Sequence, residues 1–278
     1  MPSICVCGAG TMGSGIAQVS AQAGCFTILY DINRAMLENA RMSIDKNLQS
    51  LVDKNRLGAD DKNDILSRLR FTADSNDCLA EIFIEAIIEK PEAKWALFNQ
   101  LNEVNHSEVI FATNTSSLSI SAIANKVINP QRVVGMHFFN PAPVMKLVEV
   151  VQGDQTSVET VDTIMALSRQ MGKTPVLCKD SPGFIVNRVA RPYYLEALRL
   201  LEAGVPVETI DQLMEASGFK MGPFRLMDLI GNDINYAVST SLYEALGEPE
   251  RLRPSVIQKE KIEKGALGRK TGKGYYEY

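Results

Sequence analysis

The stretch ICVCGAGTMGSGIAQVSAQA at residues 4–23 decides the fold. Its first four residues are apolar and predict a short buried strand, and residues 16–23 predict a helix. Between them, GAGTMG matches the pattern GxGxxG in the order of strand, turn and helix that the pattern requires. Glycines there permit a tight turn and let a pyrophosphate approach the free N–H groups at the helix N-terminus. We therefore predict a dinucleotide-binding loop, in preference to a purely structural turn, made of Gly8, Gly10, Thr11, Met12 and Gly13.

Asp31 is the first charged residue of the chain and follows a second predicted strand at residues 26–30. A carboxylate at this point can accept hydrogen bonds from the adenine ribose diol and would repel a 2′-phosphate. The position therefore favours NAD over NADP, although Arg34 nearby weakens that preference. Asp31 could equally be the N-cap of a following helix.

The rest of the chain predicts two domains. Up to Lys179, β-branched runs alternate with amphipathic stretches, which is the pattern of a parallel sheet flanked by helices. After Lys179 the strand-like runs vanish. Further strands are predicted at residues 82–86, 109–112, 133–137 and 146–151, and helices at 37–51, 158–171, 184–203, 207–217, 224–246 and 255–264. The sequence thus predicts an α/β domain over residues 1–183 and an all-α domain over residues 184–278.

Composition excludes several classes of protein. With 29 basic and 33 acidic residues, the chain has no overall positive field to hold nucleic acid or an anionic membrane. Its uncharged first 30 residues lack a basic leader and are broken by glycines, so we expect no export signal. The five cysteines are odd in number and form no CxxC, which predicts buried thiols in a reducing compartment, the cytoplasm. With two histidines in all, we expect no metal site.

A dehydrogenase that uses this loop needs a group to exchange the hydroxyl proton, and histidine is the natural choice. His106 lies in a polar turn, where a solvated role is expected. His137 ends a predicted strand, where open α/β sheets place their ligands. Glu149 is a lone carboxylate in the apolar run LVEVV and could hold the other imidazole nitrogen, unless it faces solvent on an alternating strand.

Two further polar groups complete a plausible site. The segment NTSS at residues 114–117 also follows a predicted strand, and a hydroxyl there could form a hydrogen bond with the substrate oxygen. Alternatively, the segment could simply cap a helix. Asn187 lies near the start of the first helix after the Ser-Pro-Gly hinge at residues 181–183, where it could face a cleft or be an ordinary polar helix residue.

Six segments together resemble the 3-hydroxyacyl-CoA dehydrogenase family in the short form typical of 3-hydroxybutyryl-CoA dehydrogenases. They are GAGTMGSGIAQ (8–18), NTSSLS (114–119), GMHFFNPAPVMKLVEVV (135–151), DSPGFIVNR (180–188), MGPF (221–224) and GRKTGKGYYEY (268–278). The resemblance implies a Rossmann-type NAD-binding domain, a helical domain that dimerises, and reversible NAD-linked oxidation of an L-3-hydroxyacyl-CoA. Separate enoyl-CoA hydratase and thiolase enzymes would be its pathway neighbours, since we expect no fused hydratase in a chain of this length.

The resemblance also implies roles for individual residues. His137 would be the base and Glu149 its orienting partner, while Ser116 and Asn187 would hold the reacting oxygen and the site geometry. Asn140 would line the site. NAD contacts would come from the glycine loop, Asp31, Glu89, Lys94 and Asn114. Without the resemblance, Glu89 and Lys94 would be interpreted as a solvated helix start.

Coenzyme A carries phosphates, and a protein with a net negative charge must bind them through a local group of basic residues. Lys54, with Lys46 or Arg56, on the polar face of the helix over residues 37–51 is the candidate, although a merely solvated face would explain these residues too. A second basic residue that the family often has one turn before Lys54 is Ser50 here, which weakens the expectation of a two-lysine clamp.

Two other functions stay open at this point. The chain could be a dehydrogenase of a free hydroxy acid or sugar acid, similar to L-gulonate 3-dehydrogenase, although the HFFNPAPVMKLVEV segment resembles the acyl-CoA branch. It could also be a non-catalytic NAD-binding structural protein. Retention of Ser116, His137, Glu149 and Asn187 together argues against a scaffold, which has no need for all four.

Overall fold

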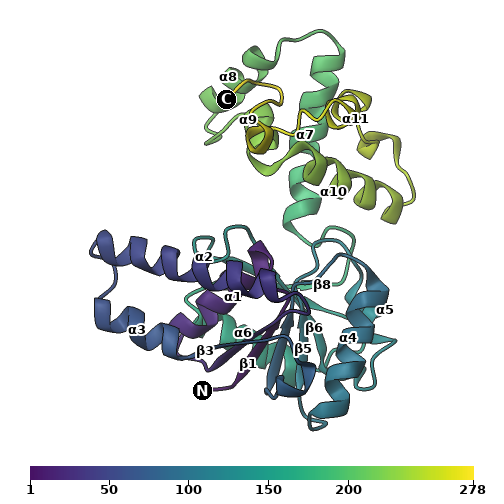
Figure 1. The fold of residues 1–278 in the computed structure, drawn as a ribbon. Helices are drawn as coiled ribbons and strands as arrows, with labels where there is room; N and C mark the ends of the chain where they lie inside the picture. Colours follow the sequence, from purple (N-terminus) through teal and green to yellow (C-terminus); the bar gives the residue numbers. More distant parts are fainter. The chain divides into compact units, whose positions relative to one another are not determined.

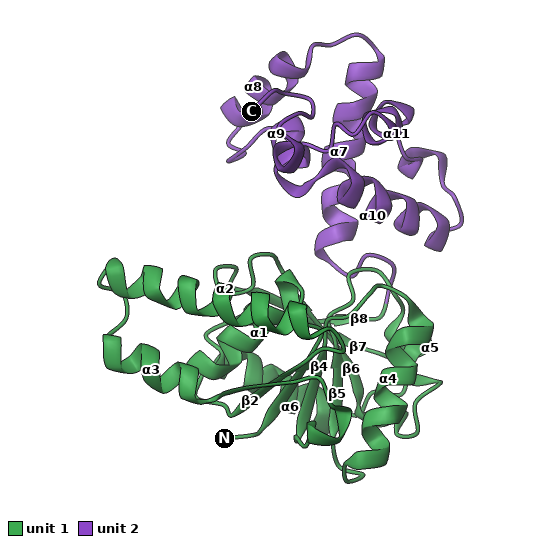
Figure 2. Ribbon diagram, in the orientation of Figure 1, with its two compact units in different colours: residues 1–180 green, residues 181–278 purple.

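The computed structural model describes all 278 residues and separates into two units, Met1–Asp180 and Ser181–Tyr278 (Figure 2). The division expected from the sequence lies after Gly183. The first unit contains a sheet covered by helices, and the second contains helices only (Figure 1). The predicted fold class, an α/β domain followed by an all-α domain, is confirmed.

The first unit is built on one eight-stranded sheet in the order β3-β2-β1-β4-β5-β6-β7-β8. Strands β1 to β6 are parallel where they pair, β7 is antiparallel to β6, and β8 is parallel to β7. The predicted parallel sheet is observed over β1 to β6, while β7 and β8 run in the opposite direction. The strands are β1 (Ile4–Cys7), β2 (Thr27–Tyr30), β3 (Leu69–Thr72), β4 (Ile82–Glu85), β5 (Ile110–Thr113), β6 (Val133–Phe138), β7 (Leu147–Gln152) and β8 (Thr174–Lys179).

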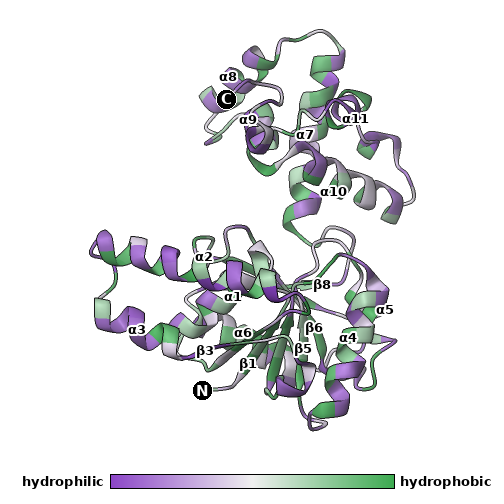
Figure 3. Ribbon diagram, viewed as in Figure 1, coloured by the Kyte–Doolittle hydropathy of each residue, from purple (hydrophilic) through white to green (hydrophobic).

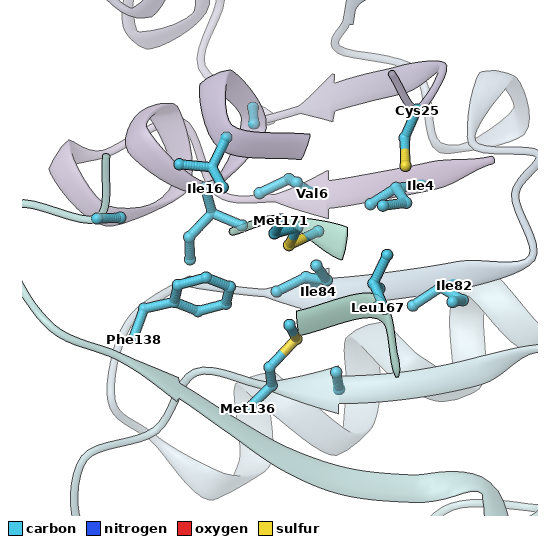
Figure 4. Packing of buried hydrophobic residues seen from close by; sticks show 14 of the residues in the cluster. Ile4, Val6, Ile16, Cys25, Ile82, Ile84, Met136, Phe138, Leu167 and Met171 are labelled. Carbon is cyan, nitrogen blue, oxygen red and sulfur yellow. The ribbon is translucent and has the colours of Figure 1, made fainter. Parts of the chain in front are cut away.

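Helices cover both faces of this sheet because its central strands are apolar on both sides. Figure 4 shows Ile16 and Leu167 packed over Val6 and Ile84 on one face. On the other face the ring of Phe98 lies 4.8 Å from that of Phe111. The helices of this unit are α1 (Thr11–Gln22), α2 (Arg34–Asp53), α3 (Ala59–Ser67), α4 (Pro91–Val104), α5 (Ile120–Ala124) and α6 (Val158–Gln170).

The sequence did not predict the two outermost strands, β3 and β8. Each lies at an edge of the sheet and lacks the uninterrupted apolar run that marks a central strand. In β8 the apolar residues Val176 and Leu177 are exposed, and Pro175 cannot donate to a ladder. Burial on both faces makes a strand recognisable in sequence, so the two outermost strands are the ones that sequence reasoning misses.

The second unit packs five helices around Leu198, Phe224 and Met227. One predicted helix, residues 224–246, is instead two, because Gly231 has a φ of 106° and ends the first of them. The helices are α7 (Val186–Glu202), α8 (Val207–Ala216), α9 (Pro223–Ile230), α10 (Asn232–Ala245) and α11 (Val256–Glu263). None of the helices in the chain is both long and apolar enough to cross a membrane.

The C-terminal segment of this unit is held by two buried carboxylates. Asp228 accepts hydrogen bonds from the backbone N–H groups of Tyr275 and Tyr276, each at 3.0 Å. Asp211 accepts one from the hydroxyl of Tyr276 at 2.8 Å. The closing GYYEY segment is therefore an integral part of the helical unit.

Strand order places a crevice beside β1. The chain runs outward through β2 and β3 on one side of β1 and through β4, β5 and β6 on the other. Loops that leave the carboxyl ends of β1 and β4 therefore diverge, and ligands of open α/β sheets bind at such a switch point. Hydrophilic residues mark the outer surfaces of α2 and α3, whereas the central strands are hydrophobic (Figure 3).

Candidate active site

The glycine loop after β1 has the backbone that a bound pyrophosphate requires. Gly8 has a φ of 101°, and a Cβ on Gly13 would lie 1.7 Å from the Gly8 carbonyl oxygen, so the turn needs glycine at both places. A Cβ on Gly10 would meet nothing within 4 Å, which leaves open space above the loop. Gly10 caps α1 without a side chain, so the first N–H groups of the helix are available to an anion.

Asp31 supports this loop directly. Its Oδ2 accepts a hydrogen bond from the Ala9 N–H at 2.7 Å, and its Oδ1 accepts one from the Asn33 N–H at 2.8 Å. The N-cap of α2 is Asn33, so the N-cap interpretation of Asp31 is wrong. A carboxylate has about four acceptor sites, and two are used here. Asp31 can therefore hold the loop and still receive a ribose hydroxyl.

A hollow of about 260 Å³ adjoins the loop. It is bounded by the glycine loop and α1, by one side of α2, and by Asn140 and the following residues to Pro143. Asn140 is exposed and thus lies at the rim. Lys54 is exposed as well, but α2 ends at Asp53, so Lys54 caps the helix and is not on its polar face as expected.

His137 and Glu149 form a buried pair. They are register partners on the antiparallel strands β6 and β7, and His137 Nδ1 lies 2.7 Å from Glu149 Oε2. The two residues are only 5% and 1% exposed, so the interpretation of Glu149 as a solvent-facing residue is wrong. The expected solvated position of His106 is observed, since that side chain is exposed and its Nδ1 accepts the Glu108 N–H.

A second buried ion pair, missed in the sequence, lies where β4 and β5 end. Lys94 on α4 donates to both oxygens of Glu85, at 2.7 and 2.9 Å, and both side chains are almost completely buried. Thr113 at the end of β5 donates to Glu85 Oε2 at 2.6 Å. Burial raises the pKa of Glu85, while Lys94 and these hydrogen bonds oppose the shift. The clue was available, since Glu85 is a lone carboxylate in the apolar run IFIEAII, as Glu149 is in its own.

Glu89 extends this network to the NTSS segment. Its Oε2 lies 3.1 Å from the Lys94 ammonium, and its Oε1 accepts hydrogen bonds from the Thr115 hydroxyl and the Ser116 N–H. Desolvation alone would raise the pKa of Glu89, but the ammonium and these donors outweigh it and lower the pKa. Lys94 is therefore not part of a solvated helix start, and Glu89 fixes the backbone at Ser116.

Asn114 ties neighbouring strands together at the same edge. Its Oδ1 accepts a hydrogen bond from the Phe138 N–H at 2.8 Å, next to His137. The N-cap of α5 is Ser119, so the NTSS segment is not the helix cap that was considered. The structure thus brings the glycine loop, Asp31, Asn114, Ser116 and the histidine pair together at the end of the sheet where the parallel strands finish. Asn187 belongs to the second unit, near the start of α7.

Comparison with known proteins supports these observations. Residues 3–181 match the profile described as "3-hydroxyacyl-CoA dehydrogenase, NAD binding domain", and residues 183–278 match that of "3-hydroxyacyl-CoA dehydrogenase, C-terminal domain". The chain is 48% identical to 3-hydroxyadipyl-CoA dehydrogenase of Escherichia coli, over 99% of this chain and 59% of that protein. It is 40% identical to a probable 3-hydroxybutyryl-CoA dehydrogenase of Deinococcus radiodurans, over 98% and 99% of the two chains.

The fold agrees as well. A crystal structure of 3-hydroxybutyryl-CoA dehydrogenase from E. coli superposes with a TM-score of 0.96 at 47% identity, over 99% of this chain and 59% of that one. The glycine loop, with its open space and uncapped helix start, fits the NAD that such a domain binds. Two matching domains and relatives similar over nearly the whole chain show that this protein belongs to the 3-hydroxyacyl-CoA dehydrogenase family of NAD-dependent oxidoreductases.

Proposed function

We propose that the protein catalyses reversible oxidation of short-chain L-3-hydroxyacyl-CoA thioesters to 3-ketoacyl-CoA, with 3-hydroxybutyryl-CoA and acetoacetyl-CoA as the simplest substrate pair. The buried pair of His137 and Glu149, at the edge of the sheet that carries the glycine loop, is the observation that supports this function most. The names of the Deinococcus relative and of the E. coli protein of known structure, both 3-hydroxybutyryl-CoA dehydrogenases, agree with it.

The pair provides the proton chemistry of the reaction. Because Glu149 holds Nδ1, the proton of the substrate C3 hydroxyl is taken up by Nε2, and the carboxylate stabilises the imidazolium that forms. In the direction of reduction, the imidazolium returns that proton. Bound NAD supplies the hydride acceptor. The low exposure of His137 keeps this proton exchange away from bulk water.

The remaining polar residues orient the substrate in this proposal. Glu89 fixes the backbone of Ser116, whose hydroxyl holds the reacting oxygen, and Asn187 holds the site geometry from α7. Asn140 lines the rim of the hollow beside the glycine loop. The exposed Lys54 at the end of α2 is a candidate contact for the coenzyme A phosphates.

Steady-state kinetics with purified protein test the function. We expect NADH oxidation with acetoacetyl-CoA and NAD reduction with L-3-hydroxybutyryl-CoA. Turnover only with free hydroxy acids or sugar acids would favour the gulonate-type alternative. No turnover with either class, in a protein that still binds NADH, would favour the non-catalytic alternative.

Asp31→Ser tests the cofactor preference. The change removes the carboxylate that would accept hydrogen bonds from the ribose diol and repel a 2′-phosphate. It also removes the hydrogen bond that the carboxylate accepts from the Ala9 N–H. We expect KM for NADH to rise by about tenfold, from the loss of hydrogen bonds to a charged group, and the ratio of NADPH to NADH activity to increase. Unchanged kinetics with both cofactors would exclude a ribose contact for Asp31.

We also propose that the protein is a dimer through its helical unit. The core of that unit uses Leu195 and Leu198 of α7, but apolar side chains on the same unit stay exposed. They include Val189, Leu213, Leu229 and Ile234, each at least 49% exposed. Burial of such side chains against a second copy would remove apolar area from water. Light scattering at micromolar concentration should give twice the chain mass, and the mass of a single chain would contradict the proposal.

A further inference from the structure

Lys173, directly before β8, is a buried lysine whose ammonium holds a single loop. The residue is 8% exposed, and it takes no part in the ion pairs that other lysines of the first unit form. Its Nζ donates hydrogen bonds to the carbonyl oxygens of Ala142, at 2.5 Å, and Met145, at 3.0 Å. Both carbonyls belong to residues 139–146, the loop between β6 and β7 (the β6–β7 loop). Lys173 therefore ties the outermost strand of the sheet to this loop.

The two carbonyls lie in a single turn of the chain. The N–H groups of Val144 and Met145 both donate to the Pro141 carbonyl oxygen, each at 3.0 Å. The carbonyls of Ala142 and Met145 accept no backbone hydrogen bond, as at the C-terminal end of a helix. A cation beside such carbonyls supplies the missing donors and interacts favourably with the peptide dipoles. The ammonium thus closes the turn.

The β6–β7 loop also forms part of the wall of the hollow beside the glycine loop. Residues 140–143 line that hollow together with the glycine loop, α1 and α2. Ala142 is 2% exposed and packs on α1, because a Cβ on Gly15 would lie only 3.1 Å from both the Ala142 Cβ and the Pro143 Cδ. The wall is therefore held in two ways, by van der Waals contact with α1 and by the ammonium of Lys173.

A buried charge is a costly means of holding a loop. Desolvation lowers the pKa of Lys173, and the nearby Lys146 contributes to the shift. Water can satisfy the carbonyls at the end of a turn, and an apolar side chain at position 173 would avoid the cost of burying a charge. The fold alone therefore does not require this ammonium, and its presence is explained if the position of the loop matters to the site.

We propose that Lys173 is a positioning residue, which holds the β6–β7 loop against α1 and thereby keeps the hollow beside the glycine loop in the shape that receives the substrate. Lys173 acts through the backbone of Ala142 and Met145. The proposal rests on the proposed dehydrogenase function, in which Asn140 at the rim of this hollow contacts the substrate.

The variant Lys173→Met separates substrate binding from chemistry. The ladder between β6 and β7 holds His137 and Glu149 without help from Lys173. We therefore expect kcat with acetoacetyl-CoA to stay within a few-fold of wild type, while KM rises by about tenfold, the effect of a loop that keeps its position about a tenth of the time. An unchanged KM in an active enzyme would overturn the proposal and leave the dehydrogenase function intact. Absence of turnover in the wild type would overturn the dehydrogenase function itself.

Hydrogen exchange tests the loop without turnover. The amides of Val144 and Met145 are bonded within the turn that Lys173 closes. In Lys173→Met we expect these two amides to exchange about tenfold faster, because local opening of the turn becomes easier. Amides of the ladder between β6 and β7 should keep their wild-type rates. Unchanged exchange in the turn would overturn the proposal, and faster exchange throughout both strands would indicate a general structural role in its place.

Lys146→Met is the matched control. Lys146 carries the same charge at the end of the same loop, but it is exposed and does not hold the loop carbonyls. We expect KM and the exchange rates of the turn to stay near wild type in this variant. An equal rise in KM would show that positive charge near the hollow attracts the anionic thioester, and would contradict the positioning role. Lys173→Arg keeps a charged donor for the two carbonyls and should recover part of the loss.

Discussion

Replacing His137 with alanine is expected to lower kcat with acetoacetyl-CoA by about 10²- to 10⁴-fold, the usual contribution of a general acid or base, while the Kd for NADH stays nearly unchanged. The separation follows from the structure. His137 and Glu149 lie on β6 and β7, whereas the glycine loop and Asp31 follow β1 and β2. Measuring kcat and the NADH Kd on the same preparation checks both expectations.

Glu149→Gln addresses the orienting role separately. The amide keeps the size of the carboxylate but cannot stabilise an imidazolium by charge, so we expect a rate loss of at least about tenfold. His106→Ala is the matched control, because His106 is the one other histidine and lies exposed in a turn. An unchanged rate in His137→Ala would remove the base assignment. An NADH Kd that rises as much as kcat falls would instead indicate a general disruption of the sheet edge.

The sequence predicted the cofactor unit well because its signals are local. Residues 4–31 contain strand, glycine turn, helix and second strand in order, and each element is recognisable from its own composition. The pairing of His137 with Glu149 is a longer-range result, since it depends on the antiparallel register of β6 and β7. The lone charge in an apolar run predicted that Glu149 needs a partner, but the direction of β7 was not foreseen.

What sequence reasoning missed lies in buried polar groups that only tertiary structure brings together. The interpretation of Lys94 as part of a solvated helix start is wrong because its partner, Glu85, lies at the end of β4 and only the fold brings the two together. Nothing in the sequence marks Arg191 as buried, since the groups that accept its hydrogen bonds, the Asn235 carbonyl and the Ser239 hydroxyl, lie on α10. A charged residue in a predicted helix or in an apolar run indicates that it has a polar partner, but only the fold shows which residue that partner is.

The pair of Lys94 and Glu85 leads to the second large effect. Lys94→Met removes the ammonium but leaves the carboxylate buried, and breaking a buried ion pair in this way costs about 3–5 kcal/mol of unfolding free energy. The double variant Glu85→Gln/Lys94→Met also removes the fully buried carboxylate and should recover most of that loss, because the one carboxylate then left without the ammonium, Glu89, is 40% exposed to solvent. Urea unfolding of the wild type, the single variant and the double variant compares their free energies of unfolding, with the same dependence of free energy on urea concentration expected for all three.

The pH dependence of this loss has a definite sign. The pKa of Glu85 is already raised above its usual 4.5 by burial, and Lys94 opposes the shift, so its removal raises the pKa further. A group with a raised folded-state pKa contributes stability below its unfolded pKa, and that stability is lost as the pH rises through the folded value. The deficit of Lys94→Met relative to the double variant should therefore be largest near pH 8 and shrink toward pH 5. A deficit that is constant across this range would show that Lys94 stabilises the fold through packing of its aliphatic chain, and not by neutralising Glu85.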